Sequence, residues 1–441
     1  MKKVFIETWG CQMNVSDSER VSTALARDGF DVTSDESLAD IIILNTCAIR
    51  EKAEHKLYSR VGRIRHQKRE KPVIGIMGCV AQLEGETLFN KIEGVDFVLG
   101  TRAVGRVSGA INETLATGIP FADVGEREDD HDWTVADTHR HSPYVVFLPI
   151  IEGCNKFCTY CIVPFSRGRE RSVPAFEIVR QVLELRRKGV REVHLIGQNV
   201  NSYGPESDAG LEGVRGKSAF SRLLRAVAAT GIERVKFTTS FPRDFRSDIV
   251  DAIEEHENLC NWVHLPVQSG SNRVLKLMKR GHTIEKYFEK IDRLRSSHRD
   301  IALTTDIIVG FPGETEADFL DSVKMVEYCG FDMAYIFKYS PRPGTPAFEM
   351  EDDVSPAEKT LRFMELERTQ KCNQNNRLQR YINQVLKVLP ESISSRSETG
   401  ITGHSTCHKI VNFEGSRDML GKIVDVRITE IKTNSLFGEV H

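Results

Sequence analysis

Three short apolar runs near the N-terminus each end at a cysteine. The runs VFIETWG, IIILNTC and VIGIMGC place Cys11, Cys47 and Cys79 at or just beyond their ends. Each run has the length and aliphatic character of a buried strand, and a helix-length segment separates it from the next. This βαβαβ order predicts a parallel sheet with covering helices over residues 1–120. Ligands of such sheets bind beyond the carboxyl ends of the strands, so we expect the three cysteines to meet in one crevice.

A second βα repeat occupies residues 144–340. Its strand candidates are YVVFLPIIEG, EVHLIGQN, RVKFTTS, WVHLPVQSG, ALTTDIIVG and MAYIFKYS. Six units favour a partial or complete βα barrel over an open sheet, and the active site of such barrels lies at the carboxyl ends of the strands. Polar groups follow several of these strands, including Gln198, Asn199, Ser240 and Gln268. They either line a ligand-binding mouth or simply end strands, as polar residues commonly do.

These patterns predict an α/β chain with a small all-β module at its end. We expect an N-terminal parallel-sheet domain at 1–120, an acidic linker at 121–142, a partial (βα)6 barrel domain at 143–372 and a β-barrel at 373–441. The linker is polar and poor in apolar pattern, and the last segment contains short strand candidates such as GKIVDVRITEI.

A second group of cysteines is local. Cys154, Cys158 and Cys161 lie within EGCNKFCTYC. Iron–sulfur clusters normally use four thiolates, so three would leave one iron of a 4Fe-4S cube without a protein ligand. The alternative is zinc, which needs four ligands and usually a second CxxC or His pair, and none lies nearby in the sequence. Four further cysteines, Cys260, Cys329, Cys372 and Cys407, lack cluster spacing, and we expect them to be buried structural thiols.

Charge and hydropathy limit where the protein can be located in the cell and what it can bind. No apolar stretch is long enough to cross a bilayer, and the first apolar run is too short for a signal peptide, so we expect a cytoplasmic protein without a membrane partner. The net charge is -3, but residues 50–71 carry nine Lys or Arg against three Glu. Such basic islands suit contact with a polyanion, or form an ordinary solvated helix face. The C-terminal candidates for RNA backbone contacts are Arg377, Arg380, Lys409, Arg417 and Lys422.

The cysteine motif EGCNKFCTYC, with Tyr160 before its last cysteine, resembles the signature of the radical S-adenosylmethionine (SAM) superfamily. TWGCQMNVSDSE, NTCAIREKAEHK and IGIMGCVAQ resemble the N-terminal domain of the methylthiotransferases, and TSFPRDF, HLPVQSGS, TDIIVGFPGET and YSPRPGTPA resemble the barrel of that family. The C-terminal segment resembles the TRAM module, an RNA-binding β-barrel. Within the family, GCQMN and NTCAIRE are similar to the branch that acts on isopentenylated adenosine in tRNA. Sister branches act on threonylcarbamoyladenosine in tRNA or on an aspartate of a ribosomal protein.

The resemblance implies a transferase with two 4Fe-4S clusters and SAM. Cys11, Cys47 and Cys79 would hold an auxiliary cluster, and Cys154, Cys158 and Cys161 the SAM-binding cluster. One SAM would donate a methyl group and a second would be the radical source, so that a methylthio group enters at carbon-2 of N(6)-isopentenyladenosine next to the anticodon of tRNA. SAM contacts would come from Tyr160, Gln198, Asn199, Ser240 and Gln268, although Tyr160 could equally pack within its loop. The implied partners are tRNA, an electron donor such as flavodoxin or ferredoxin, and iron–sulfur assembly proteins. The protein itself is expected to be a monomer.

Two positions depart from the family pattern. Phe241 stands where many relatives have histidine, and Val173 where a basic residue is common.

Two other classes of protein are alternatives: an electron carrier with two clusters, and an RNA-binding protein whose clusters are structural. Carriers usually bind each cluster with four cysteines and have no use for a complete βα barrel.

Overall fold

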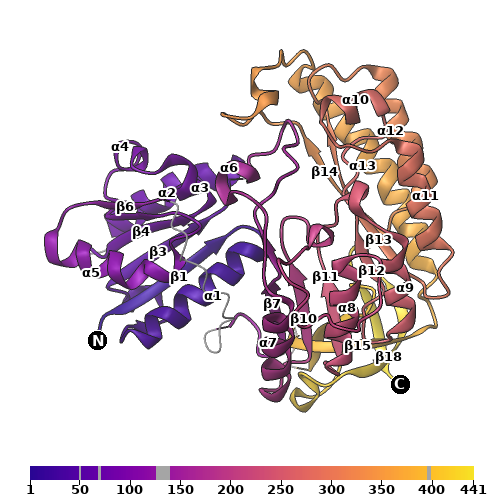
Figure 1. The fold of residues 1–441 in the computed structure, drawn as a ribbon, viewed down its shortest axis with the longest axis horizontal. Helices are drawn as coiled ribbons and strands as arrows, with labels where there is room; N and C mark the ends of the chain where they lie inside the picture. The colour runs from indigo at the N-terminus through magenta and orange to yellow at the C-terminus, as the bar shows by residue number, and fades with distance from the viewer. Residues whose placement is uncertain (49–50, 68–70, 126–139, 395–398) are drawn as a thin grey trace.

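The computed structural model describes residues 1–48, 51–67, 71–125, 140–394 and 399–441. Figure 1 shows the N-terminal sheet domain on the left and the larger βα domain on the right, with the C-terminal β-barrel below the latter. No helix in the described ranges is both long and apolar enough to cross a membrane.

The N-terminal domain is a six-stranded parallel sheet, as the βαβαβ pattern predicted. Its strand order is β2-β1-β3-β4-β5-β6. The strands are β1 (Lys3–Trp9), β2 (Asp31–Val32), β3 (Ile41–Thr46), β4 (Val73–Gly78), β5 (Phe97–Leu99) and β6 (Phe121–Asp123). Helices α1 (Gln12–Arg27) and α5 (Val107–Thr117) share one core cluster with the sheet, and α2 (Glu51–Gln67) shares another. Because helices cover both faces, every residue of β3 is buried.

Residues 121–123 correct the expected linker. They form β6, which pairs in parallel with β5 and completes the sheet. The acidic composition of this segment concealed three residues that belong to the domain, since a three-residue edge strand leaves almost no periodic signal. The part of the expected linker at 126–139 lies outside the described residues.

The central domain is a partial barrel of six parallel strands in chain order, as expected. The strands are β7 (Val145–Pro149), β10 (Glu192–Ile196), β11 (Arg234–Phe237), β12 (Trp262–His264), β13 (Ala302–Val309) and β14 (Met333–Lys338). They form two three-stranded sheets joined by a bridge between Val235 and Leu259. Covering helices include α7 (Ala175–Arg187), α8 (Ala219–Ala229), α9 (Ser247–Glu255), α11 (Ile284–Arg295) and α12 (Glu316–Cys329).

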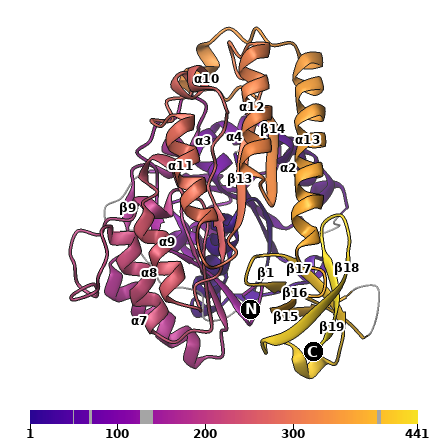
Figure 2. The same cartoon turned by 90° about the vertical axis from the view of Figure 1, so that its right-hand side faces the viewer.

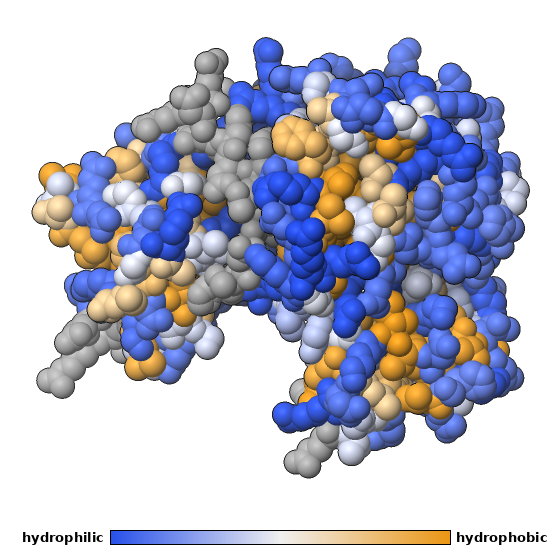
Figure 3. Space-filling view, turned by 60° about the horizontal axis from the view of Figure 1, so that its bottom comes forward, coloured by the Kyte–Doolittle hydropathy of each residue, from blue (hydrophilic) through white to orange (hydrophobic). Residues whose placement is uncertain are grey.

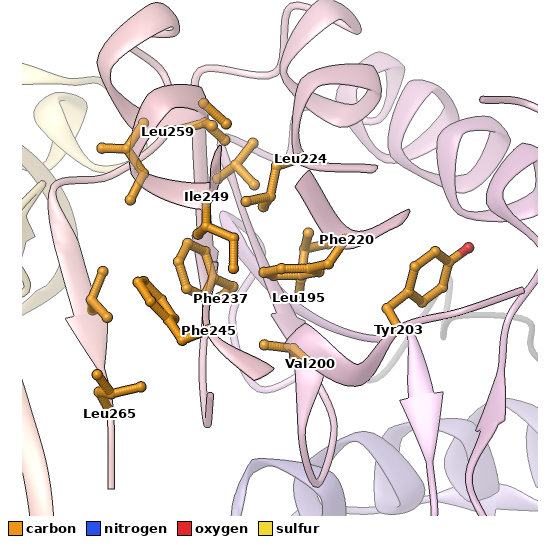
Figure 4. Packing of buried hydrophobic residues seen from close by; sticks show 14 of the residues in the cluster. Leu195, Val200, Tyr203, Phe220, Leu224, Phe237, Phe245, Ile249, Leu259 and Leu265 are labelled. Carbon is orange, nitrogen blue, oxygen red and sulfur yellow. The ribbon is translucent and has the colours of Figure 1, made fainter. Parts of the chain in front are cut away.

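The core of this domain lies between the strands and the helices. Figure 4 shows its aromatic centre, where the rings of Phe220 and Phe237 meet edge to face with centroids 5.3 Å apart. Leu195 and Ile249 pack in the same cluster, and all four side chains are buried. Burial of each such side chain contributes about 1.5–3 kcal/mol.

The C-terminal module is a closed five-stranded barrel. Its strands are β15 (Val385–Ile393), β16 (Gly400–Ser405), β17 (Ile410–Glu414), β18 (Val424–Ile431) and β19 (Leu436–Val440). The long helix α13 (Pro356–Gln379) leads into it and runs unbroken through the boundary expected between 372 and 373. Figure 2 shows this helix descending to the barrel.

The barrel docks against the amino ends of the central strands. Trp262 and Ala302, the first residues of β12 and β13, share a core cluster with barrel residues. Arg234, at the start of β11, donates to the carbonyls of His404 and Ser405 over 2.7 and 2.6 Å. The carboxyl ends of the strands, where ligands of such folds bind, therefore lie at the opposite end of the central domain. The face seen in Figure 3 is mainly hydrophilic, with scattered apolar side chains.

Candidate metal centres at the strand ends

The first three cysteines lie at one edge of the N-terminal sheet. Strands β1, β3 and β4 are neighbours, and their register pairs Trp9 with Thr46 and Thr46 with Gly78, so their carboxyl ends are level. Cys47 follows β3 directly, Cys79 follows β4 directly, and Cys11 caps the N-terminus of α1 two residues after β1. The topology thus brings together three cysteines that are more than thirty residues apart in the chain.

The electrostatic environment favours a thiolate at Cys11. A hydrogen bond with the Cys47 side chain and the positive charge of Arg167 lower the pKa of Cys11 to about 6, although the surrounding protein opposes ionisation. A thiolate is the form that binds iron or zinc. The chemistry of this donor set therefore fits a soft metal group.

Two buried asparagines, Asn14 and Asn45, are hydrogen-bonded to each other beside Cys11. Asn14 Oδ1 accepts from the backbone N–H of Cys11 over 3.3 Å and lies at the same distance from the Cys11 sulfur. Asn14 Nδ2 donates to Asn45 Oδ1 over 2.9 Å, and Asn45 Nδ2 donates back to the Asn14 carbonyl over 2.8 Å. Both asparagines are fully buried. Sequence reasoning missed this pair, although an asparagine inside the apolar run IIILN was a usable signal.

The second triplet lies on the loop between β8 (Ile151–Glu152) and α6 (Val163–Arg167). The Cys161 N–H donates to the Cys158 carbonyl over 3.0 Å, which folds the loop back on itself. Burial and the neighbouring Cys158 raise the pKa of Cys161 to about 12, and burial also raises the pKa of Cys154. Cys154 and Cys158 are buried and Cys161 is half-buried. Coordination to a metal deprotonates a thiol outright, so this donor set fits a bound metal group.

Two side chains from other parts of the central domain reach these sulfurs. Asn199, just beyond β10, donates to Cys154 Sγ over 3.1 Å. Arg280 donates to Cys158 Sγ over 3.5 Å and to the Pro266 carbonyl over 2.6 Å. Arg280 is buried, and its Nε has no hydrogen-bond partner. Nothing in the sequence distinguishes Arg280 from other arginines, so sequence reasoning missed it.

Phe241, the departure from the family pattern, packs against Arg280. The guanidinium carbon lies 4.4 Å from the centroid of the Phe241 ring, and Lys156 and Arg243 approach the same ring within 6 Å. Cation–π contact with Arg280 is strengthened by burial. The other departure, Val173, is a fully buried residue of the central core.

The remaining candidates for SAM contact divide into two kinds. Gln198 Oε1 and Ser240 Oγ are buried without a hydrogen-bond partner, which fits a mouth that receives a polar ligand. Gln268 has φ +81, a strained conformation of the kind that clusters at ligand sites. Tyr160, by contrast, packs edge to face on Phe311, outside the cysteine loop, with centroids 6.5 Å apart.

Across the described ranges, no three His, Cys, Asp or Glu side chains gather closely enough to hold a single metal ion. In a zinc site, four ligands bind the same ion, and each sulfur lies about 2.3 Å from it, so the sulfurs are close together. In an iron–sulfur cluster each thiolate binds a different iron, so the sulfurs lie further from one another.

Three of the basic candidates for RNA contact are engaged in ion pairs within the protein. Arg380 lies 2.9 Å from Asp332, and Arg377 and Lys409 lie 3.7 and 3.4 Å from the same buried carboxylate. These contacts join α13 and the C-terminal barrel to the central domain. Arg417 and Lys422 are exposed.

The basic segment at 50–71 is partly structural. Arg60 bonds to Glu7 over 2.7 Å, and Arg65 bonds to Asp96 over 2.7 Å. Lys56 and Arg63 are exposed, while Arg50, Lys68 and Arg69 lie outside the described residues.

One expectation about the other cysteines is wrong. Cys260, Cys329 and Cys407 are buried, as expected, but Cys372 is exposed on α13. An exposed helical cysteine cannot be told from a buried one by spacing when the helix is amphipathic on only part of its length.

Comparison with family models divides the chain as the fold does. Residues 3–100 match a model described as "Uncharacterized protein family UPF0004", residues 148–326 match the radical SAM superfamily, and residues 379–441 match the TRAM domain. Membership of the radical SAM superfamily implies SAM and a 4Fe-4S cluster.

Solved structures share the fold. The radical SAM methyltransferase TsrM from Kitasatospora setae aligns with a TM-score of 0.57 at 15% identity, covering 79% of this chain and 74% of that one. The cobalamin-dependent radical SAM enzyme OxsB aligns with a TM-score of 0.52 at 11% identity, covering 85% and 56%.

Fold, domain content and cysteine placement together define a radical SAM enzyme of the methylthiotransferase class. Relatives in Serratia proteamaculans and Photobacterium profundum are 42% and 40% identical, each covering 100% of this chain and 92% of the relative. Both relatives are tRNA-2-methylthio-N(6)-dimethylallyladenosine synthases, and the chain belongs to that family.

Proposed function

We propose that this protein inserts a methylthio group at carbon-2 of N(6)-isopentenyladenosine next to the anticodon of tRNA, with one SAM as methyl donor and one as radical source. The full-length similarity to synthases named for this product supports the substrate. The observation that carries the chemistry is the presence of two separate cysteine triplets, one at strand ends and one on a loop of the radical SAM barrel.

Two cluster sites follow from this proposal. Cys11, Cys47 and Cys79 would hold the auxiliary 4Fe-4S cluster, and Cys154, Cys158 and Cys161 the SAM-binding cluster. When bound, these groups supply the sulfur and the radical chemistry, while the protein binds, orients and excludes water. The amide of Asn199 orients Cys154, and the Arg280 guanidinium offers positive charge beside Cys158. The unpaired polar atoms of Gln198 and Ser240 are available to SAM.

Binding of tRNA would involve the TRAM barrel. We assign backbone contacts first to the exposed Arg417 and Lys422, because Arg377, Arg380 and Lys409 already neutralise Asp332. Flavodoxin or ferredoxin as electron donor, iron–sulfur assembly proteins as cluster source, a monomeric state and a cytoplasmic location complete the proposal. The domain division is kept, with the first domain extended to include β6 and the last domain beginning after α13.

Anaerobic reconstitution tests the proposal. Two cubes predict about eight iron and eight sulfide per chain. Reduced protein should convert SAM to deoxyadenosine, and Cys154→Ala should abolish that cleavage. An electron carrier would pass electrons without consuming SAM, and an RNA-binding protein with structural clusters would unfold on cluster loss. Intact cleavage in Cys154→Ala would refute the enzyme.

The substrate is tested separately. Mass spectrometry of tRNA nucleosides from cells that lack the gene should show loss of the methylthio group with the isopentenyl group retained. In vitro, tRNA bearing the isopentenyl group should react and the same tRNA without it should react poorly. Equal methylthiolation of both would overturn the choice of substrate.

A further inference from the structure

A short segment, Ser166–Gly168, connects the two cysteine triplets. It ends helix α6, which follows the loop of Cys154. The Ser166 carbonyl accepts from Thr101 Oγ1 of the N-terminal domain over 2.8 Å, whereas the Gly168 carbonyl accepts from the Cys154 N–H over 3.0 Å. The same few residues are thus held by the N-terminal domain on one side and by the second triplet on the other.

The side chain of Arg167 extends into the N-terminal domain. Its Nη2 donates to Asp17 Oδ2 over 2.7 Å, and the two side chains are only 4% and 1% exposed. Asp17 lies on α1, the helix that Cys11 caps. A continuous path of bonded groups therefore runs from Cys11 through α1 and Asp17 to Arg167, Gly168 and Cys154.

Arg167 also lies close to the first triplet. It ends helix α6, which packs against α3 (Cys79–Glu84), the helix that begins at Cys79. Arg167 Nη1 is buried and has no hydrogen-bond partner. A buried N–H left unpaired is destabilising, so this group is satisfied only by a further acceptor.

We infer that Arg167 is a positioning residue for the auxiliary cluster. Its ion pair with Asp17 fixes the first triplet relative to the second, and its free N–H supplies positive charge to the anionic group that Cys11, Cys47 and Cys79 bind. The inference rests on the proposed auxiliary cluster. It does not rest on the identity of the RNA substrate.

The test uses full-length protein that lacks the second triplet (Cys154→Ala, Cys158→Ala, Cys161→Ala), so that every iron signal comes from the auxiliary site. Parent protein should bind about four iron per chain. Arg167→Met and Asp17→Asn are introduced into this background, with Arg180→Met as the matched control. Arg180 is an exposed arginine that pairs with Glu184 over 2.6 Å on the outer helix α7.

Of the two variants, only Arg167→Met should lower the midpoint potential of the auxiliary cluster. Positive charge stabilises the reduced cluster, so Arg167→Met should lower the potential, whereas Asp17→Asn removes a negative charge and should raise it or leave it unchanged. Loss of Arg167 should also weaken cluster retention by about 10-fold or more, as loss of outer-shell groups commonly does. Arg180→Met should match the parent in both measurements.

Equal potentials and equal retention in Arg167→Met and the parent would overturn the inference. So would a parallel shift in both variants, because a purely structural ion pair would respond alike to loss of either partner. If Arg167→Met does not fold, Arg167→Lys keeps the charge but not the reach, and should retain the potential while it loses cluster. Absence of iron from the parent background would instead refute the auxiliary cluster, so failure of the proposed function is distinguished from failure of this inference.

Discussion

The amide of Asn199 donates a hydrogen bond to the sulfur of Cys154 over 3.1 Å, across 45 residues of sequence. A hydrogen bond to a cluster sulfur favours the reduced, more negative state. Asn199→Ala should therefore lower the midpoint potential of the SAM-binding cluster and slow reductive cleavage of SAM. Spectroelectrochemical titration and deoxyadenosine yield measure the two effects. Asn376→Ala, at an exposed position of α13, is the control, and an unchanged potential in Asn199→Ala would contradict this role.

Gly78 permits the turn that presents Cys79. Its φ is +94, and a Cβ at this position would lie 2.4 Å from Asn45 Oδ1. Gly78→Ala should lower the free energy of unfolding by about 1–3 kcal/mol from backbone strain alone, and it should also disturb the hydrogen-bonded asparagine pair beside Cys11. Urea unfolding and iron retention measure these losses. Gly105→Ala is the control, because a Cβ there meets nothing within 4 Å. Equal behaviour of the two variants would be inconsistent with the strain.

His408 makes docking of the C-terminal barrel depend on pH. Its Nδ1 lies 3.3 Å from Lys236 Nζ, and burial together with that positive charge holds the pKa of His408 well below its usual range. The unfolded chain binds a proton at this residue as the pH falls below about 6.5 and the folded chain does not, so stability should fall with falling pH from there.

His408→Asn should remove one histidine's share of that slope, at most about 1.4 kcal/mol per pH unit. Chemical denaturation between about pH 7.5 and pH 5, on both sides of the ordinary histidine pKa of about 6.5, measures the dependence of the free energy of unfolding on pH. Burial also lowers the pKa of His194, so part of the slope should remain. Asn376→Ala, at an exposed position of α13, should leave the slope unchanged. A slope unaltered by His408→Asn would contradict the prediction.

Arg417 and Lys422 should contribute to RNA affinity through charge alone. Each contact with a phosphate releases counterions. Arg417→Ala or Lys422→Ala should therefore weaken tRNA binding and reduce the slope of log affinity against log salt concentration by about one. Filter binding over a salt series measures both. Lys324→Ala, 73% exposed on α12, is the control. Lys409→Ala should instead lower the free energy of unfolding, because Lys409 pairs with the buried Asp332. Unaltered binding in both barrel variants would exclude these contacts.

The cysteine sites were accessible from the sequence because their geometry follows from topology. Parallel strands end at a common edge, so cysteines after β1, β3 and β4 must meet once the βαβ order is recognised. The six strands of the central domain were likewise readable from apolar runs of β-branched residues.

The partners of charged residues were not accessible in this way. Arg167, Arg280 and Arg377 look alike in the sequence, yet one joins two domains, one faces a thiol and one neutralises a buried aspartate. A charge pattern carries no periodicity that would identify its partner, because the partner is fixed only by tertiary packing.

The unbroken helix α13 restricts how this enzyme and its substrate can adapt to each other. A 24-residue helix leads to the barrel through a short turn, and the ion pair of Arg380 with Asp332 anchors that junction to the central domain, which restrains the barrel from swinging. A restrained barrel favours movement in the RNA instead: an adenine that stacks beside the anticodon leaves its neighbours to reach the SAM-binding site, at the expense of its own stacking energy.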